Sequence, residues 1–137
     1  MLECLVPKDS ETTIDQVKSA VKEYLDKRGW NGKQNPKNVA GSIMIEAAEL
    51  FEHFQWASPD EAVERINDPE TRKKVEMEMG DVLFYLVDLA EQNGIDLSDA
   101  FFEKLEKIKK KYPEGIGLDH NTYHRIKDQY RKSGDNQ

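Results

Sequence analysis

Apolar residues recur at helical spacing through most of the chain, and capping signals divide the pattern into segments. Thr13 followed by Gln16 forms a capping box, and Gly29 ends the first apolar series. An amphipathic helix is therefore predicted over about residues 13 to 28. Its apolar positions are Ile14, Val17, Val21, Tyr24 and Leu25.

A second helix is predicted from Pro36 to about Trp56, with Asn35 as its N-cap. Most of its circumference is apolar, and one stripe carries polar and aromatic side chains. Because such a helix is expected to be covered on several sides, this stripe is not expected on an ordinary solvated face. The stripe consists of Glu46, Glu49, His53 and Trp56. The predicted core face consists of Ala40, Ile43, Ala47, Leu50, Phe51 and Phe54.

Ser58 and Glu61 frame the start of a short helix that runs from Pro59 to about Ile66. A long helix then follows over about residues 69 to 93 and repeats the pattern of the second one. Its polar stripe consists of Glu78, Asp81, Tyr85 and Asp88, with Phe84 and Val87 on the far side. Its predicted core face consists of Val75, Met79, Val82, Leu83, Leu86, Leu89 and Ala90.

A further helix is predicted from a cap at Asp96 or Ser98 to about Lys111, with a lysine-rich outer side. Its inward positions are Ala100, Phe101, Leu105 and Ile108. No strand pattern occurs, so the sequence predicts an all-α protein built on a four-helix bundle. We expect one domain over residues 1–112 and a tail over 113–137 with one short helix on Tyr123, Ile126 and Tyr130.

The charge balance limits the classes of partner. With 20 basic and 27 acidic side chains, the chain has a net charge of -7 and no basic face for a nucleic-acid polymer. A nucleotide substrate is still compatible, since a divalent cation reverses the local field. The single cysteine, Cys4, fits a reducing compartment. No secretion signal or membrane span is evident, so we expect no membrane partner and a cytoplasmic location.

The two polar stripes suggest a metal site. Acids three residues apart on a helix can aim at one point, as Glu46 and Glu49 can, and as Glu78 and Asp81 can. If the two helices pack side by side, four carboxylates converge and repel one another unless a hard cation such as Mg²⁺ binds. The alternative is that each pair is an ordinary solvated helix face.

The neighbouring side chains leave similar choices open. Trp56 and Tyr85 lie near the acids, where they could stack on a base or simply pack. His53 is more simply explained as an interhelical hydrogen-bonding residue. Lys104 and Lys111 are solvated by default, although either could reach a phosphate.

Four segments carry a resemblance to a known family. They are NPKN at 35–38, EAAELFEHFQW at 46–56, EMGDVLFYLVDLAEQNGIDL at 78–97 and the lysine-rich run that ends in KYP at Pro113. Over residues 17–113 the chain resembles the MazG-like all-α nucleotide pyrophosphohydrolases, and among them the dCTP pyrophosphatase type. Members of that type carry Asn in the last helix at the position of Ile108, so the sugar and base preference stays open.

The resemblance implies a Mg²⁺-dependent enzyme, with Mn²⁺ as a substitute ion, that splits a nucleoside triphosphate into monophosphate and pyrophosphate. It implies a homodimer or homotetramer. It places metal ligands on Glu46, Glu49, Glu78 and Asp81, base-stacking aromatics on Trp30 and Trp56, and a substrate contact on Tyr85.

In the expected mechanism, Glu46 or Glu49 orients the attacking water. Two rivals share the bundle and the metal logic, namely an all-α dUTPase and a phosphoribosyl-ATP pyrophosphohydrolase. A rival of another class is a non-catalytic helical interaction protein whose acids are structural. The residues themselves also favour an oligomer, because helices that are apolar on nearly every side leave exposed surface in a lone bundle.

Overall fold

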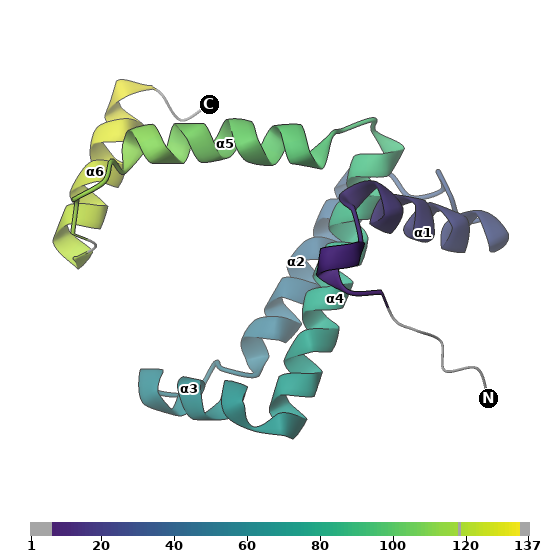
Figure 1. The fold of residues 1–137 in the computed structure, drawn as a ribbon, viewed down its shortest axis with the longest axis horizontal. Helices are drawn as coiled ribbons and strands as arrows, with labels where there is room; N and C mark the ends of the chain where they lie inside the picture. Colours follow the sequence, from purple (N-terminus) through teal and green to yellow (C-terminus); the bar gives the residue numbers. More distant parts are fainter. Residues whose placement is uncertain (1–6, 118, 135–137) are drawn as a thin grey trace. The chain divides into compact units, whose positions relative to one another are not determined.

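The structure is a computed structural model that describes residues 7–117 and 119–134 (Figure 1). Within these ranges all regular structure is helical and no strand occurs, which confirms the predicted all-α class. Backbone contacts divide the chain into two units, Met1–Ile95 and Asp96–Gln137, and each is described by itself. The predicted domain boundary after residue 112 stays a prediction. The elements are η1 (Asp9–Glu11), α1 (Ile14–Lys27), α2 (Pro36–Glu52), α3 (Pro59–Asn67), α4 (Pro69–Gln92), α5 (Leu97–Lys111) and α6 (His120–Ser133).

The helix starts lie where the capping signals predict them. Thr13 Oγ1 accepts from the Gln16 amide at 3.2 Å, and the Gln16 side chain accepts from the Thr13 amide at 2.7 Å. Ser58 and Glu61 form the same reciprocal pair at the start of α3. Such caps satisfy amides that have no partner inside the helix, and each stabilises its helix by about 1 kcal/mol.

The first unit is organised on a hairpin of α2 and α4, which run side by side in opposite directions with α3 between them in the chain (Figure 1). Val39 of α2 and Val75 of α4 are buried. The two acid-bearing helices therefore face each other, as the metal-site hypothesis requires.

α1 packs on the C-terminal half of α4. Val21 and Leu25 of α1 are buried, and so are Val87 and Ala90 of α4. Asp88 is 3% exposed and accepts a hydrogen bond from the Gln92 side chain at 2.5 Å. No helix in the described ranges is long and apolar enough to cross a membrane.

Part of the predicted core face of α4 is exposed in the single chain, so this part of the prediction is wrong. Met79 is 58% exposed, and Leu83 and Leu86 are exposed as well. α4 instead buries Val87 and Asp88, because α1 covers a side of the helix that the sequence pattern assigned to the periphery. Phe51 of α2, also predicted in the core, is exposed too.

The predicted C-terminal end of α2 is also wrong. The helix ends at Glu52, and residues 53–56 form turns in which the Phe54 amide donates to the Phe51 carbonyl at 2.9 Å. The His53 carbonyl accepts from the Arg65 guanidinium of α3 at 2.9 Å, which holds the chain as it turns toward α3. Trp56 therefore lies outside the helix, and its side chain is 83% exposed.

The second unit contains α5 and α6, and α6 is the short helix predicted in the tail. Tyr112 stacks on Tyr123 with ring centroids 6.0 Å apart, and the Lys111 ammonium lies 4.8 Å from the Tyr130 ring centroid. Ile126 is buried. Contrary to prediction, Ala100, Phe101 and Ile108 of α5 are exposed, because α5 meets α6 only near its C-terminal end.

Candidate metal centre

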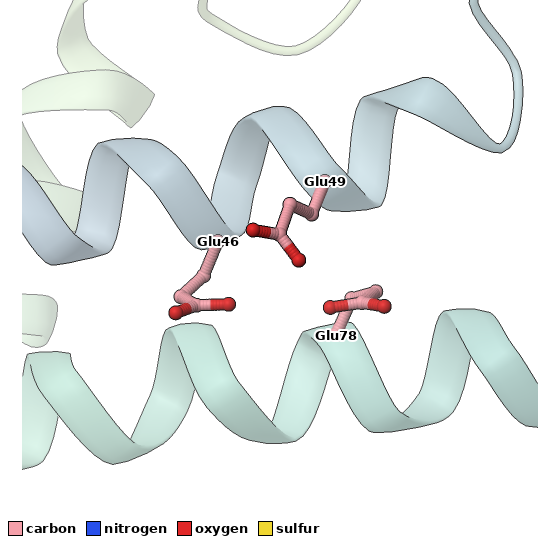
Figure 2. A group of neighbouring side chains, drawn as sticks. All are labelled: Glu46, Glu49 and Glu78. Atoms are coloured by element: carbon pink, nitrogen blue, oxygen red, sulfur yellow. The ribbon is translucent and has the colours of Figure 1, made fainter.

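Three carboxylates meet between α2 and α4. Figure 2 shows Glu46 and Glu49 projecting from one helix toward Glu78 on the other. One oxygen from each of the three lies within 4.8 Å of those from the other two. The spacing of three residues puts Glu46 and Glu49 on one side of α2, and the packing of the hairpin brings that side to α4.

The electrostatic strain of this group falls on Glu46, which is half-buried. Burial raises the pKa of the Glu46 carboxyl above its ordinary value, and the charges of Glu49, Asp81 and Glu78 raise it further. Without a cation, this site disfavours a fully ionised cluster.

Asp81 takes a different position from the other three predicted acids. It lies one turn beyond Glu78 on α4, is exposed, and falls outside the three-carboxylate group. Its charge nevertheless acts on Glu46. The structure therefore brings together three of the four predicted ligands and leaves the fourth beside them.

His53 approaches the group from the end of α2. Its Nε2 atom lies 3.7 Å from an oxygen of Glu78, and both side chains are largely shielded from solvent. A protonated His53 would form an ion pair with Glu78 at this distance. The hydrogen bond from Arg65 to the His53 carbonyl holds the His53 backbone in place. No spacing in the sequence indicated this hydrogen bond between Arg65 and His53.

The predicted substrate-contacting residues are spread over both units. Trp30 follows the C-terminus of α1 and is 52% exposed, and Tyr85 is half-buried on α4 on the side that carries Glu78 and Asp81. Trp56 lies between α2 and α3. Lys104 and Lys111 lie on α5, in the second unit.

Sequence reasoning missed the neighbours of Trp30. Tyr24 of α1 meets Trp30 edge to face, with ring centroids 6.3 Å apart and an interplanar angle of 72°, and it lies perpendicular to Phe84 of α4, at 5.7 Å. The sequence placed Tyr24 on the apolar face of its helix but gave no indication of which helix this face meets.

The donor set of the cluster suits a hard divalent cation. All ligand atoms in the group are carboxylate oxygens, which Mg²⁺ and Mn²⁺ prefer to nitrogen or sulfur. A cation there would also remove the mutual repulsion that raises the pKa of Glu46. The residues present therefore fit such an ion.

Comparison with known proteins agrees with this arrangement. Residues 42–127 match the model of the MazG-like family. The chain is 32% identical over 103 residues to mouse dCTP pyrophosphatase 1, covering 75% of this chain and 61% of the relative. Human dCTP pyrophosphatase 1 is 31% identical over 103 residues, again with 75% of this chain and 61% of the relative covered. A pyrophosphatase from Archaeoglobus fulgidus DSM 4304 superposes with a TM-score of 0.70 at 37% identity, covering 80% of this chain and all of the other.

The described residues form helices only, two of which, α2 and α4, carry the acids, and this fold agrees with the family match. The chain belongs to the MazG-like family. The chain spans about three fifths of the length of the mammalian dCTP pyrophosphatases that it matches.

The raised pKa of Glu46 predicts how the metal-free protein responds to pH. The folded state binds a proton on Glu46 more tightly than the unfolded state does, so its stability falls as the pH rises from below 4.5, the ordinary value, through the raised pKa. In EDTA, Glu46→Gln should raise the melting temperature at pH 7, and this gain should shrink as the pH falls toward 4.

Glu76→Gln is the matched control, since Glu76 is an exposed acid of α4 that pairs with Arg72 and Lys73 instead. Thermal unfolding followed by circular dichroism at several pH values measures both variants. The same pH dependence in the two would contradict the assignment of the strain to Glu46.

Proposed function

We propose that this protein is a Mg²⁺-dependent nucleoside triphosphate pyrophosphohydrolase that converts a (d)NTP to the monophosphate and pyrophosphate. A dCTP-like nucleotide is the leading substrate. The observation that carries the proposal is the convergence of Glu46, Glu49 and Glu78 between two helices of a MazG-like chain. The names of its mammalian relatives and of the archaeal structure support the reaction class.

Glu46, Glu49 and Glu78 would hold the cation, with Asp81 as the fourth ligand. When bound, Mg²⁺ neutralises phosphate charge and makes phosphorus more electrophilic. Asp81 is exposed at the edge of the group, so it can join the ligand set by a change of side-chain rotamer.

A carboxylate of the chain would accept the proton of the attacking water. Glu46 or Glu49 orients a water for in-line attack on a phosphorus of the α–β anhydride and accepts its proton as the bond to the new phosphate oxygen forms. The anhydride bond breaks and pyrophosphate leaves with the bonding pair.

The remaining proposed substrate contacts are aromatic and basic residues. Trp30 and Trp56 are exposed indole rings that can stack on a base, and Tyr85 can contact the sugar or base beside the acids. Lys104 and Lys111 remain proposed phosphate contacts on the strength of their charge alone.

We propose further that the functional form is a homodimer or homotetramer. The exposed apolar side chains are too many for a surface that stays in water. On α2 and α4 they are Met44, Ile45, Phe51, Met77, Met79, Leu83 and Leu86. A second copy of the chain is the simplest cover for them, since obligate homodimers bury apolar surface of this kind.

Turnover by site variants tests the proposed metal ligands. Glu49→Gln and Asp81→Asn should keep the helical circular dichroism spectrum but lower the rate of pyrophosphate release by about 10² to 10⁴, because each removes a ligand charge or the base. Glu76→Gln is the control and should be near normal, since it changes an acid on the same helix outside the group. Near-normal release from both site variants would eliminate the metal-site hypothesis.

A substrate panel tests the reaction class. Canonical and modified (d)NTPs, dUTP and phosphoribosyl-ATP are each incubated with Mg²⁺, and pyrophosphate is scored against phosphate. Release of pyrophosphate with preference for cytosine nucleotides supports the proposal. Preference for dUTP or phosphoribosyl-ATP would assign one of the related activities. No Mg²⁺-dependent hydrolysis of any nucleotide would leave a non-catalytic helical protein.

Sedimentation tests the proposed assembly. Sedimentation velocity at micromolar concentration should show two or four chains together. Leu83→Glu should shift the protein toward the monomer, because it puts a charge on the exposed apolar side of α4. Lys73→Glu also adds negative charge to an exposed position of α4 and should leave the assembly intact. A wild-type monomer at this concentration would contradict the proposal.

A further inference from the structure

A chain of aromatic rings joins the end of α1 to α4. Trp30 meets Tyr24 edge to face, with ring centroids 6.3 Å apart, and Tyr24 lies perpendicular to Phe84 at 5.7 Å. Phe84 is perpendicular to Tyr85, at 5.3 Å. Edge-to-face geometry at these separations is favourable for aromatic pairs. The exposed indole of Trp30 is thereby connected to Tyr85, which shares its side of α4 with Glu78 and Asp81.

The backbone of Trp30 is fixed by the way α1 ends. Gly29 adopts a φ of 63°, and its amide donates to the Asp26 carbonyl at 3.0 Å. The Trp30 amide reaches back to the Leu25 carbonyl at 2.9 Å. This pair of bonds is a Schellman motif, which needs a residue free to take the left-handed conformation at the glycine position. The motif therefore fixes the position of the Trp30 backbone at the end of α1.

The ring of Tyr24 is held from more than one side. The Arg28 guanidinium carbon lies 3.7 Å from its centroid, and an Arg28 nitrogen donates to the Tyr24 carbonyl at 3.0 Å. Together with Trp30 and Phe84, these contacts leave Tyr24 little freedom. Tyr24 nevertheless stays 41% exposed, so its contribution to the core is smaller than that of buried Leu25.

We infer that Tyr24 and Phe84 are positioning residues for the base end of the site. They hold the Trp30 indole at a fixed distance from Tyr85, so that an aromatic base can stack on Trp30 while its triphosphate reaches the acids. This inference rests on the proposed function, because it assumes a nucleotide substrate. Neither residue is required to touch the reacting atoms. Loss of either ring should therefore weaken nucleotide binding and leave the chemical step largely intact.

Steady-state kinetics with dCTP and saturating Mg²⁺ test the inference. Tyr24→Leu should raise KM about tenfold with kcat changed less than about threefold, since a misplaced stacking ring loses uniform binding. Tyr24→Phe keeps the ring and should restore KM. Ile14→Ala is the matched control, because Ile14 is an equally exposed apolar residue on α1, 42% against 41%, at the other end of the helix.

Fluorescence supplies a readout that general destabilisation would not reproduce. The chain has two tryptophans, so Trp56→Phe leaves Trp30 as the reporter. Adding Tyr24→Leu to that variant should make Trp30 emission more accessible to acrylamide and weaken its quenching by dCMP in EDTA, because the monophosphate carries the base without the triphosphate charge that the cation would neutralise. Unchanged quenching and unchanged KM in Tyr24→Leu would overturn the inference. If the wild type hydrolyses no nucleotide, the proposed function itself fails.

Discussion

The packing of α2 against α4 is the constraint on which the rest of this structure depends. Each helix carries acids on the side that meets the other, so forming the hairpin brings Glu46, Glu49 and Glu78 within 4.8 Å of one another. Carboxylates at this separation repel, and the raised pKa of Glu46 reports that repulsion together with burial. A chain selected only for packing would gain by replacing these acids with apolar residues. The proposed cation would account for their presence, because it offsets the repulsion among them.

Other parts of the first unit serve the same hairpin. Arg65 of α3 donates to the His53 carbonyl where α2 ends, which places His53 beside Glu78. On the other side of α4, α1 covers Val87 and ends in a turn that presents Trp30. The metal-binding end and the base-binding end of the proposed site are thus both built on α4.

Local signals predicted the helices well, since caps act within one turn. The boxes at Thr13 and Ser58 lie where the sequence placed them. Glu46 and Glu49 project from one side of α2, as their spacing predicts, whereas Asp81 falls outside the carboxylate group. The predictions that were wrong depend on contacts between helices. The apolar pattern of α4 could not say which side α1 would cover, so Leu83 was assigned to the core although it is exposed in the single chain. The prediction that α2 extends to Trp56 is wrong, because the chain turns after Glu52, where the Arg65 guanidinium of α3 donates to the His53 carbonyl. Helical periodicity carries no information about such a contact.

The central claim is that the acids of α2 and α4 form one divalent-cation site. The most direct test is a Mn²⁺ titration of isotopically labelled protein followed by NMR, because the paramagnetic ion broadens only nearby signals. The account predicts that substoichiometric Mn²⁺ first broadens the backbone amides around Glu46–Glu49 and Glu78–Asp81, and that excess Mg²⁺ restores them. Broadening confined to other acidic positions, such as Glu103 and Glu106 on α5, with these two turns unaffected, would contradict it.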